Sequence, residues 1–144
     1  MQEMTDLVSI EEKTFIESAL LLAKEARDNG EIPVGAIVVM DSVIIGTGYN
    51  KQLEDCDPTA HAEIVALRQA AKKEKNFRLD GAKMFVTVKP CSMCDEAIKR
   101  ARISEVIFIS PRARPSTHRV AYKEANEYSE ISSKMLKEFF KEKR

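Results

Sequence analysis

Apolar side chains recur at helical spacing near the start of the chain, with charged residues between them. The residues concerned are Phe15, Ala19, Leu22, Ala23 and Ala26. This spacing predicts an amphipathic helix over residues 14–28. The Asn29-Gly30 pair that follows is a typical signal for the end of a helix.

The next apolar segments are too short for helices and are typical of strands. Residues 34–40 are almost continuously apolar, and residues 43–48 form a second short apolar segment. Asp41-Ser42 lies between them and is suited to a tight turn. The pattern therefore predicts a β-hairpin.

Helices and strands alternate in the rest of the chain. We predict helices over residues 61–75 and from Pro90 to about Ala101, with Thr59 as N-cap of the first, and strands over residues 84–88 and 105–110. A strand–helix–strand crossover of this length makes the two strands parallel neighbours in one sheet, which implies a mixed sheet with helices on both faces. Two further helices are predicted near residues 119–127 and 130–142. The second carries an apolar stripe, in which Phe139 and Phe140 are expected in the core or at an interface.

Composition and charge narrow the class of protein. The chain has 144 residues, no repeat and no linker-like segment, so we expect a single domain over residues 1–144. Lys plus Arg and Asp plus Glu are both 23, so the overall charge does not indicate a polyanion binder. No apolar segment approaches the roughly 20 residues of a membrane span. Three cysteines and no signal-peptide pattern indicate a cytoplasmic protein without disulfides or a membrane partner.

Two short motifs carry most of the candidate chemistry. The first is His61-Ala62-Glu63, and the second is Pro90-Cys91-Ser92-Met93-Cys94. They supply one imidazole, two thiols on one helical face and a carboxylate. Structural zinc sites close all four positions with Cys and His, whereas catalytic sites use three protein ligands and leave the fourth position to water. The set is therefore suited to activating a water, with Glu63 able to move its proton.

Other interpretations of these residues remain open at this stage. A Cys-x-x-Cys pair alone is often half of a structural zinc site or a redox pair. Cys56 is close enough in sequence to His61 to be a fourth ligand, although a thiol with no metal is the simpler expectation. His118 and a local excess of basic residues are either a solvated face or phosphate contacts. The basic residues are Lys99, Arg100, Arg102, Arg112, Arg114 and Arg119.

The order and spacing of the two motifs resemble those of the zinc-dependent deaminases of the cytidine and deoxycytidylate deaminase superfamily. Within it, the chain most resembles the bacterial tRNA-specific adenosine deaminases. The resemblance runs from residue 15 to about residue 108 and is carried by residues 31–36, 48–50, 57–64, 66–70, 76–79 and 90–94. The segment 76–79 (Asn-Phe-Arg-Leu) favours this subfamily over free-base deaminases, whereas 57–64 is shared with guanine deaminases.

The resemblance implies a fold, a cofactor and a set of site residues. The fold would be an α/β/α three-layer sandwich with a mixed five-stranded sheet, as in cytidine deaminase-like proteins. His61, Cys91 and Cys94 would hold one Zn²⁺ per subunit, and Glu63 would be catalytic. The substrate-binding residues would be Asn50, Val34, Ala62 and Pro90. Asn50 would bond the base edge, and Val34 would line the base pocket.

The implied reaction is conversion of adenosine to inosine at the wobble position of a tRNA anticodon loop, by a homodimer. The chain departs from the family pattern at Lys89, where Glu is usual, and over residues 110–119, which are short and basic. Residues 110–119 lie where contacts with RNA are expected, so these departures bear on which substrate is used and leave the expected catalytic residues unchanged. A free nucleobase or nucleotide deaminase of guanine or cytosine type is the alternative enzyme. A non-catalytic, zinc-stabilised RNA-binding module is the alternative from another class.

Overall fold

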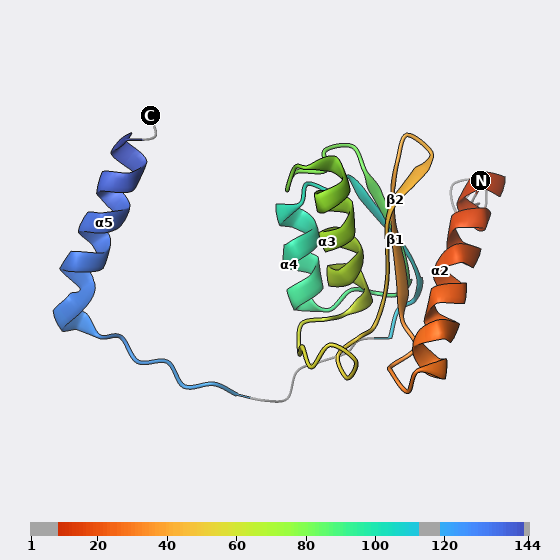
Figure 1. Cartoon of the computed structure of the whole chain (residues 1–144), viewed down its shortest axis with the longest axis horizontal. Helices are drawn as coiled ribbons and strands as arrows, with labels where there is room; N and C mark the ends of the chain where they lie inside the picture. Colours follow the sequence, from red (N-terminus) through yellow and green to blue (C-terminus); the bar gives the residue numbers. More distant parts are fainter. Residues whose placement is uncertain (1–8, 113–118, 143–144) are drawn as a thin grey trace.

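A four-stranded sheet lies between one helix on one face and two helices on the other, as Figure 1 shows for this computed structural model. The structure describes residues 9–112 and 119–142. Helix α2 (Ile10–Asp28) covers one face of the sheet, and helices α3 (Ala62–Glu74) and α4 (Ser92–Arg100) cover the other. The predicted three-layer arrangement is therefore confirmed.

Helix α2 begins earlier than the apolar spacing alone predicts. Ser9 is its N-cap, and the Ser9 hydroxyl accepts a hydrogen bond from the backbone N–H of Glu12 while the Glu12 carboxylate accepts one from Ser9. This reciprocal pair satisfies two backbone donors that the first turn of a helix leaves without partners. The helix ends at the predicted place, where Gly30 has a φ of 76° that glycine adopts without strain.

The sheet has four strands in the described residues, so the expected five-stranded sheet is wrong. The strands are β1 (Gly35–Met40), β2 (Val43–Tyr49), β3 (Lys83–Val88) and β4 (Glu105–Ser110), in the order β2-β1-β3-β4. Strand β1 is antiparallel to β2 and β3, and β3 is parallel to β4, as the crossover predicted. The sequence contains four strand-like segments, and the expectation of a fifth came from the resemblance alone.

The two faces of the sheet bury different side chains because successive residues of a strand point to opposite faces. Ile37, Val39 and Phe85 form the layer that faces α2, where the Phe15 and Phe85 rings lie 5.3 Å apart. The opposite layer packs against α3 and α4 and includes Ala36, Val38, Met84, Val86, Ala66 and Ile98. This second layer supports the ends of α3 and α4 that carry the predicted ligands.

Gly48 of β2 lets the start of α3 approach the sheet closely. A Cβ atom at this position would lie 2.5 Å from the carbonyl oxygen of Ala62 and 2.6 Å from the backbone nitrogen of Ala66. Real Cβ atoms do not approach other atoms so closely, so a side chain here would push α3 outwards. The position of the first turn of α3 therefore depends on a residue without a side chain.

The C-terminal segment stands apart from the sheet in Figure 1. A short 3-10 turn, η1 (Asn126–Tyr128), precedes helix α5 (Ser129–Glu142), which matches the predicted last helix. The helix predicted near residues 119–127 is wrong, since residues 119–125 are not helical. Phe139 and Phe140 are 52% and 60% exposed, so they are not part of the core. No helix in the described part of the chain is long and apolar enough to cross a membrane.

Candidate functional site

Both predicted ligand motifs lie at helix starts. His61 is the N-cap of α3 and Cys91 is the N-cap of α4, and both have extended backbone conformations. N-cap side chains usually accept a hydrogen bond from their own helix, but neither His61 nor Cys91 does so. The predicted cap, Thr59, bonds Asp57 instead. The side chains at the two helix starts therefore lie away from the capping position.

The three predicted ligands come together. Nδ1 of His61 lies 3.5 Å from Sγ of Cys91 and 3.4 Å from Sγ of Cys94, and one ligand atom from each residue lies within 4.8 Å of the others. Tetrahedral zinc with Zn–N near 2.05 Å and Zn–S near 2.3 Å requires an N···S separation of about 3.6 Å. The observed separations and the His-Cys-Cys donor set both fit zinc. Cys94 is buried, while His61 and Cys91 are half-buried.

Glu63 lies in the first turn of α3, two residues after His61, and its side chain is fully buried. A buried carboxylate is unusual unless it has a specific role or partner. The third free cysteine, Cys56, is exposed, and its Sγ donates a weak hydrogen bond of 3.8 Å to the carbonyl oxygen of Leu53. Cys56 is therefore not part of the metal-binding group.

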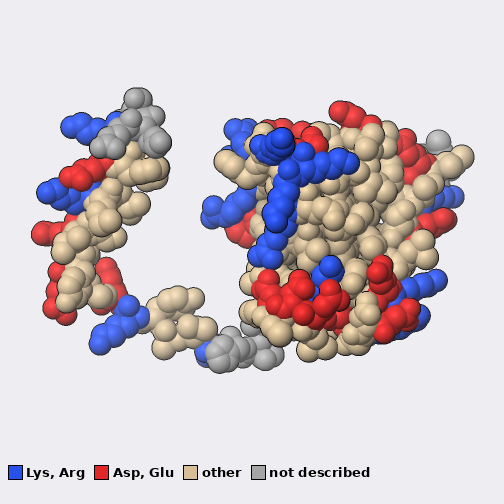
Figure 2. Space-filling model, in the orientation of Figure 1, with Lys and Arg blue, Asp and Glu red and all other residues tan. Residues whose placement is uncertain are grey.

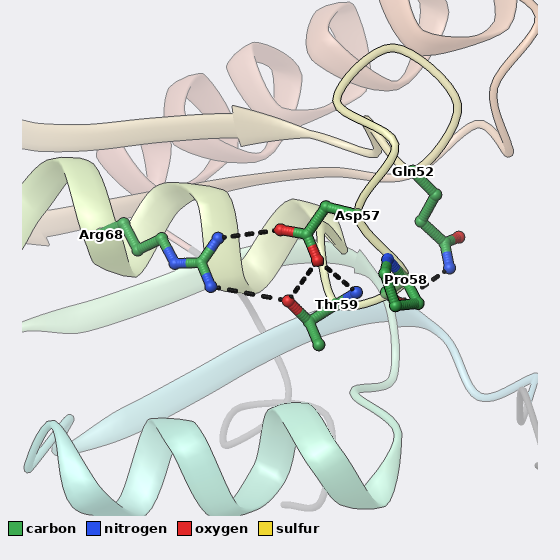
Figure 3. A network of polar contacts seen from close by, with 5 residues as sticks. All are labelled: Gln52, Asp57, Pro58, Thr59 and Arg68. Atoms are coloured by element: carbon green, nitrogen blue, oxygen red, sulfur yellow. Dashed lines mark hydrogen bonds and ion pairs between the residues drawn. The ribbon is translucent and has the colours of Figure 1, made fainter.

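The loop before His61 is held by a polar network around Asp57 (Figure 3). The Asp57 carboxylate accepts hydrogen bonds from the backbone N–H and the hydroxyl of Thr59, at 2.8 and 2.7 Å. Arg68 of α3 donates to the other carboxylate oxygen at 3.2 Å. These donors, Thr59 first and Arg68 after it, hold the pKa of Asp57 below its ordinary value. The loop is thereby tied to the helix that it precedes.

Asn50 and Val34, the predicted base-pocket residues, are both buried and lie next to each other. Asn50 directly follows β2, and its backbone N–H donates to the carbonyl oxygen of Val34 at 3.1 Å. The next residue, Lys51, donates to the carbonyl oxygen of Ala60, which adjoins His61. Asn50 is therefore linked, through the backbone hydrogen bond of the residue that follows it, to the residue that precedes His61.

The other two predicted substrate residues lie at the two helix starts. Ala62 is the first residue of α3 and is fully buried in the same core cluster as Val34. Pro90 is half-buried between β3 and α4, directly before Cys91. It lines a shallow groove together with Lys89, Ser92, Asp95, Val106 and Phe108. The unusual Lys89 is therefore exposed beside the metal-binding group.

Glu31 belongs to this region and was not singled out from the sequence. It is only 6% exposed, and its carboxylate accepts hydrogen bonds from the Asn50 side chain and from two backbone N–H groups of the loop. The only sequence signal for it is a charged residue shortly before the apolar segment over residues 34–40. That signal is weak, because a charged residue at this place is usually exposed.

In Figure 2, acidic side chains gather at the bottom of the sheet domain, and basic side chains run along its upper left with some acidic side chains among them. Both helices have acidic residues in the first turn and basic residues in the last turn, which suits the helix dipole. Lys99 and Arg100 pair with Asp95 and Glu96 at 2.9 and 3.5 Å and lie at the end of α4 opposite Cys91. They are therefore paired residues of the surface, remote from the ligands. His118 and Arg114 lie outside the described residues.

Comparison with a family model agrees with this geometry. The model described as the cytidine and deoxycytidylate deaminase zinc-binding region matches residues 9–110. The tRNA-specific adenosine deaminase of Buchnera aphidicola subsp. Schizaphis graminum is 47% identical over 94 residues, which cover 65% of this chain and 62% of that protein. The chain spans about three fifths of the length of the curated relatives it matches.

Two solved structures share the fold. One comes from studies of A-to-I editing by tRNA:A34 deaminases, with a TM-score of 0.67 and 41% identity over 68% of this chain and 75% of that chain. The other is a guanine deaminase from Bacillus subtilis, with a TM-score of 0.70 and 28% identity over 84% of this chain and 91% of that chain.

Proposed function

Since the chain belongs to the cytidine and deoxycytidylate deaminase zinc-binding family, we propose that it is a hydrolytic deaminase that converts adenosine to inosine at the wobble position of tRNA. The observation that carries the proposal is the convergence of His61, Cys91 and Cys94 beside a buried Glu63. The choice of tRNA adenosine as substrate is supported by the relatives at 41–48% identity, which are named for that activity.

Three residues of this chain would hold the metal, and a fourth would move protons. His61, Cys91 and Cys94 supply three ligands, and this number leaves one coordination position for a reactant. Zinc, when bound, acts as a Lewis acid and makes a hydroxide nucleophile accessible near neutral pH. Glu63 is two residues from His61 on the same helix start, which suits it to work on a group beside the metal.

The proposed reaction uses Glu63 as a proton carrier. Water adds to C6 of the adenine ring, the C6–N bond breaks, and ammonia leaves. Glu63 takes a proton from the attacking water and passes it to N1 of the ring, and it then takes the proton of the new C6 hydroxyl and passes it to the departing amino nitrogen. Inosine therefore keeps a proton on N1, ammonia leaves, and the carboxylate is regenerated in each cycle. General acid–base catalysis of this kind contributes roughly 10²–10⁴-fold to the rate.

The substrate-binding part of the proposal concerns four buried or half-buried residues around the helix starts. Asn50 contacts the nucleoside through its side-chain amide, and Val34 packs against the flat face of the base. Ala62 and Pro90 line the pocket through their positions directly beside His61 and Cys91. Support comes from two backbone hydrogen bonds, from Asn50 to Val34 and from Lys51 to Ala60, which tie Asn50 and Val34 to the segment directly before His61.

The direct test is incubation of the zinc-loaded protein with a tRNA anticodon stem-loop that carries adenosine at the wobble position. The expected product is inosine at that position, measured by nucleoside mass spectrometry, with ammonia in equal amount. The Glu63→Ala protein serves as the control and should bind zinc without producing inosine. If the wild-type protein binds zinc and RNA but releases no ammonia from any substrate, it is a zinc-stabilised RNA-binding module instead.

A second candidate function is deamination of a free nucleobase. The observation that favours it is the guanine deaminase of Bacillus subtilis, whose structure covers more of this chain than the tRNA deaminase structure does. The chain is 28% identical to the guanine deaminase and 41% identical to the tRNA deaminase structure, so free-base deamination is the second candidate. Ammonia release from guanine, cytosine, adenosine and the stem-loop, measured side by side at equal concentrations, separates the two functions.

The proposal also includes a homodimer in the cytoplasm. Apolar side chains exposed at the surface support an oligomer, among them Phe77 beside the groove between α3 and α4 and the apolar face of α5. The three free cysteines suit a reducing compartment. Sedimentation equilibrium over a range of concentrations should give twice the chain mass, whereas a single chain mass throughout contradicts the dimer. The single-domain organisation over residues 1–144 stays a prediction.

A further inference from the structure

We infer that Glu31 is a positioning residue that presents the side chain of Asn50 to the substrate as a hydrogen-bond acceptor. The inference rests on the proposed function, since it assigns a chemical requirement to the substrate of the same site. It goes beyond that function because it specifies which atom of Asn50 faces the ligand. It also assigns a role to a residue that does not itself touch the substrate.

The Glu31 carboxylate is the centre of a buried set of hydrogen bonds. Its Oε1 atom accepts from Nδ2 of Asn50 at 3.4 Å and from the backbone N–H of Leu53 at 3.1 Å. Its Oε2 atom accepts from the backbone N–H of Glu54 at 2.8 Å. A carboxylate only accepts hydrogen bonds, so the Asn50 atom that faces Glu31 has to be the N–H₂ group.

A second chain of hydrogen bonds gives Asn50 the same orientation independently. The Nε2 group of Gln52 donates to the carbonyl oxygen of Pro58 at 3.0 Å, and a carbonyl oxygen can only accept. Figure 3 shows this contact beside the Asp57 network. Because the Gln52 amide is oriented by Pro58, its Oε1 atom faces Asn50 and accepts from Nδ2 at 3.2 Å. Both acceptors therefore hold the N–H₂ group of Asn50 away from any ligand.

The oxygen of the Asn50 amide is left as an acceptor. Asn50 is 1% exposed, and its Oδ1 atom is buried with no hydrogen-bond partner among the described residues. A buried polar atom without a partner is rare in proteins and requires a specific explanation, which at this place in the proposed site is a bound substrate. A ligand that pairs with Oδ1 needs an N–H or O–H group at that point. In a nucleoside this donor is either a sugar hydroxyl or an N–H of the base.

The position of Asn50 connects this requirement to the proposed site. Lys51, the next residue, bonds the carbonyl oxygen of Ala60, which adjoins His61. Glu31 also bonds the loop that follows Asn50, so the same carboxylate orients the amide and holds the loop. A substrate without the donor would leave Oδ1 unpaired, which typically reduces affinity by a large factor.

The test measures binding of three RNA hairpins to the zinc-loaded full chain, in a Glu63→Gln background that prevents turnover. The hairpins carry adenosine, 2′-deoxyadenosine or purine ribonucleoside at the target position. The second lacks the sugar 2′ O–H donor, and the third lacks the amino N–H donor. We expect one of these two to bind about tenfold or more weakly than adenosine, and which one it is identifies the donor.

The role of Glu31 is tested by repeating the measurement with three variants. Glu31→Met keeps the side-chain length and removes both carboxylate oxygens, which leaves only the neutral Gln52 amide oxygen to orient Asn50, so the preference for the donor-bearing hairpin should fall. Glu31→Gln keeps one acceptor for Asn50 and should retain most of the preference. Glu54→Gln removes the same charge from an exposed residue of the same loop and should retain all of it. An unchanged preference in Glu31→Met, or equal binding of all three hairpins to the parent protein, overturns the inference.

A second readout does not depend on RNA binding. In ¹H–¹⁵N spectra, the side-chain amide protons of Asn50 should exchange slowly with water in the parent and Glu54→Gln proteins and rapidly in Glu31→Met. If no hairpin binds, the proposed function fails, while unchanged exchange in Glu31→Met means that Glu31 does not orient Asn50. If Glu31→Met does not fold, Gln52→Met removes the other acceptor and should give the same two changes.

Discussion

Nδ1 of His61 lies 3.4 Å from Sγ of Cys94, although the two residues are 33 positions apart in the chain. The contact forms because α3 and α4 begin at the same end of the sheet and each begins at a ligand. No disulfide or long loop is needed to bring them together. The sheet order, with β1 and β3 as central neighbours, positions both helix starts.

Replacing one buried thiol should remove the metal, while replacing the exposed one should not. We expect Cys94→Ser to lose stoichiometric zinc, because Cys94 is buried and is one of the three ligands that the described residues bring together. Cys56→Ser is the matched control, since Cys56 is an exposed free cysteine. Zinc content is measured by atomic emission after dialysis. Full zinc in Cys94→Ser, or loss of zinc in Cys56→Ser, would contradict the assigned ligands.

Glu63→Gln should separate catalysis from metal binding. The substitution keeps the volume of a fully buried side chain and removes its ability to accept a proton. We expect kcat to fall by roughly 10²–10⁴-fold, the usual contribution of a general acid–base group, with zinc content unchanged. Glu74→Gln, on the exposed last turn of the same helix, should keep full activity. Retained turnover in Glu63→Gln would remove Glu63 from the mechanism.

Asp57 should make a stabilising contribution that is lost in acid. Its pKa lies below the ordinary 3.8 because Thr59 and Arg68 donate hydrogen bonds to its carboxylate. A group whose pKa is lowered by folding stabilises the protein above its unfolded pKa, and the contribution disappears as the pH falls through the folded pKa. The difference in urea midpoint between wild type and Asp57→Asn should therefore be constant above about pH 5 and shrink below pH 3.8.

Two comparisons show whether the pH dependence comes from the carboxylate of Asp57. Subtracting the midpoints of the two proteins cancels the loss of zinc in acid, because both have the same metal ligands. Asp80→Asn removes an exposed carboxylate that pairs with Arg78 and should change the midpoint very little at any pH. A difference for Asp57→Asn that grows in acid, or does not change, would show that the network around Asp57 does not depend on its charge.

Gly48→Ala should weaken zinc binding, although Gly48 is not one of the proposed metal ligands. The new Cβ atom would lie 2.5 Å from the carbonyl oxygen of Ala62, so α3 has to move away from β2. Overpacking of this kind typically costs about 1–3 kcal/mol in the free energy of unfolding. We also expect weaker zinc binding in a competition assay with a chelator, because His61 stands at the start of α3 and moves with that helix. Val43→Ala, at an exposed position of the same strand, should change neither measurement.

Structural features that are set by residues close together in the sequence could be predicted from the sequence. The hairpin over β1 and β2 follows from the short apolar segments around Asp41-Ser42, and the parallel pairing of β3 and β4 follows from the crossover between them. His61 and Cys91 were placed at helix starts for the same local reason, and the structure confirms that they meet. The fifth strand was wrong because no segment of the described chain has a strand pattern that would supply it.

Features that depend on distant residues could not be predicted. Residues 119–125 include the apolar Val120, Ala121, Tyr122 and Ala125, but all seven are exposed, so no burial against the described residues stabilises a helix there. Thr59 looked like an N-cap, yet its hydroxyl bonds Asp57, which is brought close by the turn of the loop. Glu31 could not be identified because its importance comes from donors 19 to 23 positions away in the sequence, which only the fold brings to it.

The placement of His61 and Cys91 at two helix starts couples metal occupancy to folding. The first turns of α3 and α4 lack a side-chain cap, so a bound ion would restrain both turns at once. An ion that binds the folded state alone stabilises it by an amount that grows with the logarithm of free ion concentration. The lifetime of this protein in a cell, and with it the amount of enzyme present, would therefore follow the zinc supply of that cell.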